Sequence, residues 1–259
     1  MLQPLITAAL APVLLVQGRR VRRTALELPE AAGPREGLSG SGEPFRLLVL
    51  GDSAGAGVGV VHQNQAITGR LVQALSAQHT VQWRLVARTG HRLSHVIRAA
   101  QALTSQATDL VVVSVGINDV LQGTSAARWA QGLQQLAEVL QERLVPGQVA
   151  FSTIPRIQDF PLLPQPLAWY LGRRAQQLNR ITHQILSSPL HGPSTLGSPA
   201  SPGPLARWKA VDLDLPLTAD FLAHDGFHPN EAACGLWCQQ VMAAIHTESR
   251  PGIASDRRS

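Results

Sequence analysis

The chain has 259 residues, 44% of them hydrophobic, which is enough to bury a full core as one α/β domain with appendages. The formal net charge of +5 comes from 22 basic and 17 acidic residues, but the arginines are scattered rather than gathered on one periodic face with aromatic residues. Because zinc-finger, RNA-recognition and helix-turn-helix signatures are also missing, the sequence argues against nucleic acid as a partner.

Residues 1–44 are predicted to precede the folded domain. The apolar stretch at 5–16 is too short to span a bilayer, which needs roughly 20 residues. Four arginines follow it within residues 19–23, whereas a secretory signal carries its basic residues first. We expect residues 1–23 to be a packing segment; the alternative is a peripheral membrane anchor whose arginines meet anionic head groups on the cytoplasmic side. Residues 24–44, with several prolines and glycines, are predicted to be a linker.

From residue 45 onwards, strand-like and helix-like stretches alternate. In chain order the predicted strands are 45–50, 81–86, 110–115, 149–154 and 208–213, and the predicted helices are 67–78, 94–103, 125–144, 167–186 and 231–246. The β-branched run at 111–113 lacks polar alternation, which is typical of a strand covered by helices on both faces. We therefore predict a parallel five-stranded sheet in a three-layer α/β/α domain over residues 45–247. A serine-, proline- and glycine-rich loop at 187–205 interrupts it, and a polar tail follows at 248–259.

A serine lies at the carboxyl end of the first predicted strand, in Gly51-Asp52-Ser53, where its hydroxyl can be exposed at the edge of the sheet. A serine hydroxyl is a weak nucleophile, so it needs a base within hydrogen-bond reach and a third group that orients the base. Asp225 and His228, three residues apart after the last predicted strand, can fill these two roles. The alternative for this pair is an incidental acid and histidine in a solvated loop.

Acyl transfer also requires hydrogen-bond donors aimed at the negative charge that develops on the carbonyl oxygen. Asn118 offers a side-chain amide just after the third predicted strand, and Gly90 offers a backbone N–H after the second. The N–H of Ser53 itself would be a third donor. Taken singly, an asparagine or a glycine after a strand is more often only a turn residue.

In combination, these segments resemble the SGNH, or GDSL-type, esterases and lipases, whose sequence blocks occur here in the expected order: Gly51-Asp52-Ser53, Gly90, Gly116-x-Asn118-Asp119 and Asp225-x-x-His228-Pro229. The resemblance implies a flavodoxin-like sheet and a serine hydrolase that needs no metal or other cofactor. It also implies the roles: Ser53 as nucleophile, His228 as base, Asp225 as its orienting group, and Ser53, Gly90 and Asn118 as the oxyanion hole. The first block has Ala54 where the fuller family motif has leucine, a departure that leaves the chemistry untouched.

The substrate implied by the resemblance is a small-molecule or lipid-like ester, with acyl-ester, lysophospholipid, thioester and acetylated-sugar substrates all open. Five apolar residues are candidates for an acyl pocket, although such residues more often fill a core: Phe160, Leu162, Leu163, Trp169 and Phe227. The proline-rich connection at 154–166 is the segment expected to shape specificity.

Two other classes of hydrolase stay open. Gly51–Gly55 also fits the Gly-x-Ser-x-Gly motif of α/β-hydrolases, although those enzymes normally place several strands before the serine. A metallophosphatase would instead hold manganese or zinc, through Asp52, Asn118, Asp119 and His228. Its usual Gly-Asp-x-His segment is missing, because Ser53 stands in the intervening position.

Four further residues of reactive type are expected to be structural. Cys234 and Cys238 lie four apart in the last predicted helix, where they should pack against the core as free thiols. This is compatible with a reducing compartment, and a cytoplasmic location is the expectation, with membrane association as the alternative. His91 and His95 are predicted to lie on a solvated helix face, because the Glu of a zinc-binding His-Glu-x-x-His motif is replaced by Arg92.

Overall fold

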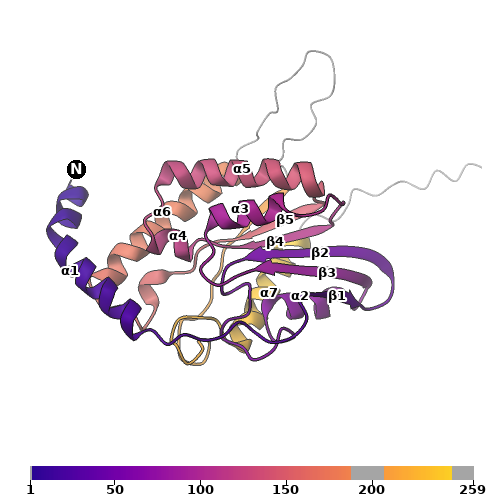
Figure 1. Cartoon of the computed structure of the whole chain (residues 1–259), viewed down its shortest axis with the longest axis horizontal. Coiled ribbons are helices and arrows are strands. Elements are labelled where there is room, and N and C mark those ends of the chain that lie inside the picture. Colours follow the sequence, from indigo (N-terminus) through magenta and orange to yellow (C-terminus); the bar gives the residue numbers. More distant parts are fainter. Residues whose placement is uncertain (1, 188–206, 247–259) are drawn as a thin grey trace, which may run out of the picture.

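The computed structural model describes residues 2–187 and 207–246, so nearly all of the predicted loop at 187–205 and the whole tail at 248–259 lie outside the described residues (Figure 1). Its centre is a six-stranded sheet in the order β1-β3-β2-β4-β5-β6. The strands are β1 (Glu36–Ser39), β2 (Glu43–Gly51), β3 (His79–Ala87), β4 (Leu110–Ser114), β5 (Gln148–Ser152) and β6 (Trp208–Val211). Every adjacent pair is parallel except β1 with β3. The predicted α/β class is confirmed, and β1 adds one antiparallel edge strand to the five parallel strands.

Helices cover both faces of this sheet (Figure 1). One layer consists of α3 (Leu93–Gln101), α5 (Ala126–Leu144) and α6 (Leu167–Ser187), and the other of α2 (Ile67–Leu75) and α7 (Glu231–His246). Two short elements lie in the connections after β4 and β5, namely α4 (Ile117–Leu121) and the 3-10 turn η1 (Ile157–Asp159). At the amino-terminal end, α1 (Leu2–Thr24) packs against α6.

The central strands contribute to both hydrophobic layers. In β2, Leu48 and Leu50 pack in the cluster that contains α3 and α5, whereas Leu47 and Val49 pack in the cluster that contains α2 and α7. All four side chains are buried. Because successive side chains of a strand point to opposite faces, a strand covered on both sides needs apolar residues at every position. This requirement explains the continuous apolar runs in the sequence.

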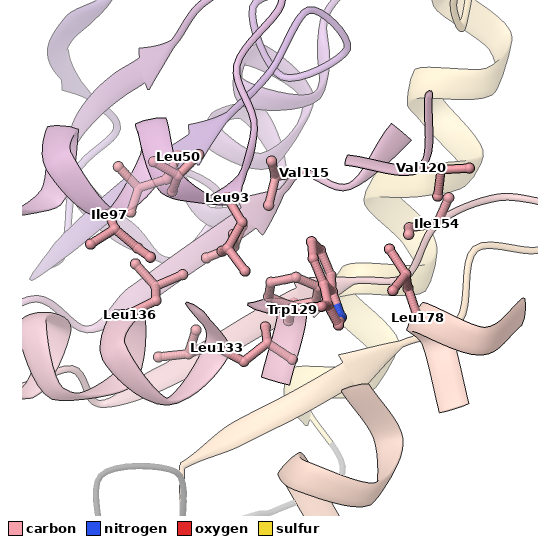
Figure 2. Packing of buried hydrophobic residues seen from close by; sticks show 14 of the residues in the cluster. Leu50, Leu93, Ile97, Val115, Val120, Trp129, Leu133, Leu136, Ile154 and Leu178 are labelled. Carbon is pink, nitrogen blue, oxygen red and sulfur yellow. The ribbon is translucent and has the colours of Figure 1, made fainter. Parts of the chain in front are cut away.

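Trp129 of α5 occupies the middle of the larger layer, surrounded by Leu93, Leu133 and Ile154 (Figure 2). Its ring meets that of Phe151 edge-on, with ring centroids 6.2 Å apart. The indole N–H donates to the Thr182 hydroxyl of α6 over 3.0 Å. A buried indole needs such an acceptor, because an unsatisfied N–H loses its hydration without compensation. This bond therefore links α5 to α6 inside the core.

The segment predicted as a linker at 24–44 is instead folded onto the domain. Its strand β1 pairs with β3, from Glu36 opposite Arg84 to Ser39 opposite Val81. Upstream of β1, the Gln63 side chain donates to the backbone carbonyl of Ala31. With only four residues, β1 is too short to display a periodic pattern between its flanking glycines, which is why the sequence did not reveal it.

Helix α1 contains Pro12 and extends over 23 residues. It packs against the domain through Leu14, which is buried. The Gln17 side chain adds two bonds: its amide donates to the Gln165 carbonyl over 2.7 Å, and its oxygen accepts from the Leu167 N–H over 3.1 Å. In the described part of the chain, no helix combines the length and hydrophobicity needed to cross a membrane.

We expect Thr182→Val to lower the free energy of unfolding by about 1–3 kcal/mol, because it leaves the buried indole N–H of Trp129 without an acceptor. Thr68→Val is the matched control, since the Thr68 hydroxyl is equally buried and has no partner among the described residues. Urea unfolding should show a loss only for the first variant. Equal changes in the free energy of unfolding of the two variants would contradict a stabilising role for the hydrogen bond of the Trp129 indole.

Candidate active site

The register of the sheet brings three loops to one edge. Gly51 at the end of β2 lies opposite Ala87 of β3 on one side and Ser114 of β4 on the other. Since parallel strands end at the same edge, the loops that follow them emerge side by side. These loops carry Ser53, Gly90 and Asn118.

Ser53, His228 and Asp225 form a continuous hydrogen-bonded chain. The Ser53 Oγ lies 2.8 Å from His228 Nε2, and His228 Nδ1 lies 2.5 Å from Asp225 Oδ2. The backbone N–H groups of Phe227 and His228 both donate to Asp225 Oδ1, each over 3.0 Å. Burial favours the neutral carboxyl group, but the bonds from His228 and Phe227 outweigh it and lower the pKa of Asp225. An ionised Asp225 accepts a hydrogen bond from the Nδ1–H group of His228. This tautomer leaves His228 Nε2 free to accept a hydrogen bond from the Ser53 hydroxyl.

The loop that carries His228 is held against the loop that carries Ser53. The Ala223 N–H donates to the His228 carbonyl over 2.8 Å, which closes the histidine loop on itself. Gly59, with a φ of +106°, passes so close to this loop that a Cβ there would lie 2.4 Å from the Pro229 carbonyl oxygen. Beyond the loop, Glu231 at the start of α7 forms an ion pair with Arg70 of α2. These contacts fix the histidine relative to a serine 175 residues earlier in the chain.

The loops after β3 and β4 are joined by a side-chain bond. The Asn118 amide donates to the His91 carbonyl over 3.0 Å. An amide group has two N–H bonds, so this contact orients the group and leaves its second donor available. Gly90, directly before His91, has a φ of +80°, and a Cβ there would meet no atom within 4 Å. Backbone conformation rather than space therefore favours glycine at this position.

Asp119 performs a structural task that the sequence did not suggest. Its Oδ2 accepts from the Leu93 N–H at the start of α3, and its Oδ1 accepts from the Thr124 hydroxyl, each over 2.9 Å. Burial raises the pKa of this carboxyl group, although both bonds oppose the shift. The residue thus ties α3 to α4, and with it the Gly90 loop to the Asn118 loop.

The metallophosphatase alternative requires Asp52, Asn118, Asp119 and His228 to converge on one ion. Instead, Asp119 is turned to Leu93 and Thr124, and Asn118 donates to a carbonyl. Within residues 2–187 and 207–246, no three His, Cys, Asp or Glu side chains are grouped so that they could hold a metal ion.

Asp52 is buried immediately before the serine. Its Oδ1 accepts from the Ala54 N–H over 3.1 Å. Burial raises the pKa of this carboxyl group to about 7, against the opposing effects of the Ala54 N–H and the His228 charge. Its protonation therefore changes near neutral pH, one residue away from Ser53.

A predominantly apolar cavity adjoins these groups. The residues next to Ser53, Asn118 and His228 in sequence contribute to its wall, namely Asp52 and Ala54, Ile117, and Phe227 and Pro229. The wall is completed by the connection after β5, including Ile154 and Phe160, and by residues 213–222. Of the five apolar candidates from the sequence, Phe160 and Phe227 line this cavity, whereas Leu162, Leu163 and Trp169 do not.

The two histidines predicted on a solvated helix face are half-buried and carry structural contacts. His95 Nδ1 accepts from the Arg92 N–H over 3.0 Å at the start of α3. Its ring stacks on that of His91, with ring centroids 5.3 Å apart. Burial lowers the pKa of His91, and the neighbouring His95 adds to this effect. The prediction of a solvated helix face came from the spacing of the two histidines. That spacing did not reveal that α3 starts beside the loop that carries Asn118.

Cys234 and Cys238 are buried free thiols, as expected from their spacing. Burial raises the pKa of Cys234 to about 12 and that of Cys238 to about 11.

The parallel sheet and the motif-bearing loops at its carboxyl edge define an SGNH-type hydrolase. The model of the GDSL-like lipase/acylhydrolase family matches residues 49–234, which is more than half of the chain, and the protein belongs to this family. The family predicted from the sequence is thus confirmed, and the α/β-hydrolase alternative is wrong.

Solved structures show the same fold. TesA is 18% identical with a TM-score of 0.56, over 78% of this chain and 98% of its own. A psychrotrophic esterase, EstA from Pseudoalteromonas sp., is 18% identical with a TM-score of 0.52, over 77% and 96% of the two chains. A lipase from a goat rumen metagenome is 15% identical with a TM-score of 0.54, over 77% and 97%. The sequence has no match among the curated proteins.

We expect Asp52→Asn to stabilise the protein at alkaline pH. Because the pKa of Asp52 is higher in the folded state than its ordinary value of 3.8, its contribution is complete below about pH 4 and is lost as the pH rises through about 7. Asparagine can keep the bond from the Ala54 N–H without acquiring a charge. Its advantage over wild type should be absent at pH 4 and reach about 4 kcal/mol at pH 8, by urea unfolding. The exposed Asp214→Asn is the control, and a gain independent of pH would contradict the assignment.

Proposed function

We propose that the protein hydrolyses carboxylic esters, with Ser53 as nucleophile, His228 as general base and Asp225 as the group that orients the histidine. The observation that carries this proposal is the hydrogen-bonded chain from the Ser53 hydroxyl through both ring nitrogens of His228 to Asp225. Membership of a lipase/acylhydrolase family supports ester hydrolysis independently of that geometry.

The reaction then has two halves. In the first half, the Ser53 oxygen attacks the ester carbonyl carbon as its proton moves to His228 Nε2, and the leaving alcohol takes this proton when the C–O bond breaks. In the second half, water attacks the acyl-enzyme by the same route and releases the carboxylic acid. The carboxylate of Asp225 stabilises the imidazolium that forms in each half, because its bond to Nδ1 is charge-assisted.

Three donors are proposed to stabilise the tetrahedral intermediate: the N–H of Ser53, the N–H of Gly90 and the Asn118 side-chain amide. The bond from Asn118 to the His91 carbonyl supports this role, since it holds the amide beside the Gly90 loop before substrate arrives. Donors that are already oriented need no rearrangement as charge develops, which is what makes an oxyanion hole effective.

The acyl group is proposed to be an apolar chain that enters the cavity beside the triad. The cavity wall includes Ile117, Ile154, Phe160 and Phe227, which offer hydrophobic contact and no charge. Its one titratable side chain is the buried Asp52. Such a wall favours simple carboxylic esters and lipid-like esters over acetylated sugars, whose acyl group is small and whose polar part needs hydrogen-bond partners.

Ser53→Ala should abolish hydrolysis of p-nitrophenyl butyrate, because no other group supplies the attacking oxygen. The exposed Ser94→Ala is the matched control and should retain wild-type kcat. Asn118→Ala should lower kcat by about 10²–10³ without a comparable change in KM, since its donor acts on the transition state. A serine-directed phosphonate should inactivate wild type and leave a covalent adduct on Ser53, detected by mass spectrometry.

The same assay separates the proposal from metal-dependent chemistry. Treatment with a chelator should leave the rate unchanged. Hydrolysis that survives in Ser53→Ala, or that disappears with chelator, would overturn the assignment.

The proposed acyl site is tested by narrowing the cavity. Leu217→Trp fills space at a partly exposed position of the wall, so the chain should still fold. We expect kcat/KM for p-nitrophenyl octanoate to fall at least tenfold relative to wild type, with the acetate ester affected much less. Leu38→Trp, at an exposed position of β1, is the size-matched control. A uniform effect on both esters would show that the acyl chain lies elsewhere.

A further inference from the structure

Helix α1 presents an outward face that the rest of the described protein does not cover. Its inward face consists of Leu10, Leu14, Gln17 and Val21, which are buried or partly buried against the domain. Outward-facing Val13, Leu15 and Val16 are 44%, 60% and 65% exposed. Apolar side chains concentrated in this way on a surface indicate contact with an apolar phase or a partner.

The charged residues of α1 are all basic and all lie near its carboxyl end. The exposed apolar residues lie in the middle of the helix, and four exposed arginines follow in the last two turns: Arg19, Arg20, Arg22 and Arg23. The first acidic residue of the chain is Glu27, beyond the end of the helix. None of the four arginines forms an ion pair within the described residues. The described outward surface is therefore apolar at residues 13–16 and basic at residues 19–23.

This charge arrangement complements the surface of an anionic bilayer. Apolar side chains at residues 13–16 can enter the boundary between acyl chains and head groups, while arginine guanidinium groups bind phosphates at the head-group level. A protein partner would need a matching acidic groove beside an apolar one, whereas an anionic lipid surface supplies both along its whole area.

The position of α1 connects this surface with the cavity. Figure 1 shows α1 at the side of the molecule, beside α6 and separate from the sheet. Gln17 holds it to the backbone of Gln165 and Leu167. Those residues end the connection after β5 that contributes Ile154 and Phe160 to the cavity wall. A helix bound to lipid would thus lie next to the segment that forms one wall of the cavity.

We propose that the outward face of α1 binds the surface of an anionic lipid bilayer as a peripheral, non-spanning contact. Val13, Leu15 and Val16 enter the interface, and the arginines at 19–23 bind lipid phosphates. The proposal does not depend on ester hydrolysis, since it rests on the exposure and charge of α1 alone.

The test measures co-sedimentation of the full chain with vesicles made from ether-linked lipids, which contain no carboxylic ester. Wild type should bind vesicles that contain anionic phosphatidylglycerol and should not bind pure phosphatidylcholine vesicles. Binding should weaken as salt is added. Arg19→Gln/Arg23→Gln should bind about thirtyfold more weakly. Leu15→Ser/Val16→Ser should lose at least tenfold, because less apolar surface enters the interface.

Arg84→Gln/Arg143→Gln is the charge-matched control, with Arg84 exposed and Arg143 partly exposed outside α1, and it should bind like wild type. Thermal unfolding by circular dichroism should show that every variant is folded. No binding of folded wild type to anionic vesicles, or equal losses for the two arginine pairs, would overturn the proposal. A wild-type dimer that Leu15→Ser/Val16→Ser converts to monomer would also overturn it, because a second copy would then cover this face.

Discussion

The parallel pairing of β2 with β3 and β4 is the constraint on which the rest of the site depends. It sets Gly51, Ala87 and Ser114 level with one another, so that three separate loops begin at the same edge. The fourth loop, which carries Asp225 and His228, comes from the carboxyl-terminal part of the sequence and must be brought to the same edge. Gly59 makes this possible by letting the backbone approach Pro229 at a distance that no side chain would permit. The site therefore depends on backbone register first and on side-chain chemistry second.

Three aspartates near this edge have different pKa values because their surroundings differ. Asp225 receives bonds from His228 and Phe227 and has a lowered pKa. Asp52 and Asp119 are more deeply buried, and burial raises the pKa of each. Only Asp225 combines a stable negative charge with contact to the histidine ring, so only it suits the stabilisation of an imidazolium.

The sequence predicted the parallel sheet, its helices and the family, because these depend on long apolar periods and on spaced motifs. It predicted neither β1 nor the packing of residues 30–35, whose side-chain hydrogen bonds with the rest of the domain join residues 32 to 59 positions apart and leave no periodic signal. The task of Asp119 was also missed, since an acceptor for the Leu93 N–H is recognisable only once α3 and α4 are adjacent in space. The roles assigned to Ser53, His228 and Asp225 stay predictions that their geometry supports.

The two hydrogen bonds of the Gln17 side chain to Gln165 and Leu167 have a consequence for the order in which the chain folds. They join residues separated by 148 and 150 positions. At the usual rate of synthesis, residues 165–167 are made about 7–30 s after Gln17. During that interval the helix has no docking site, and both its inward and its outward apolar residues are exposed to solvent. Arg19, Arg20, Arg22 and Arg23 place four charges next to this apolar stretch, and charged residues of this kind oppose association of exposed apolar segments.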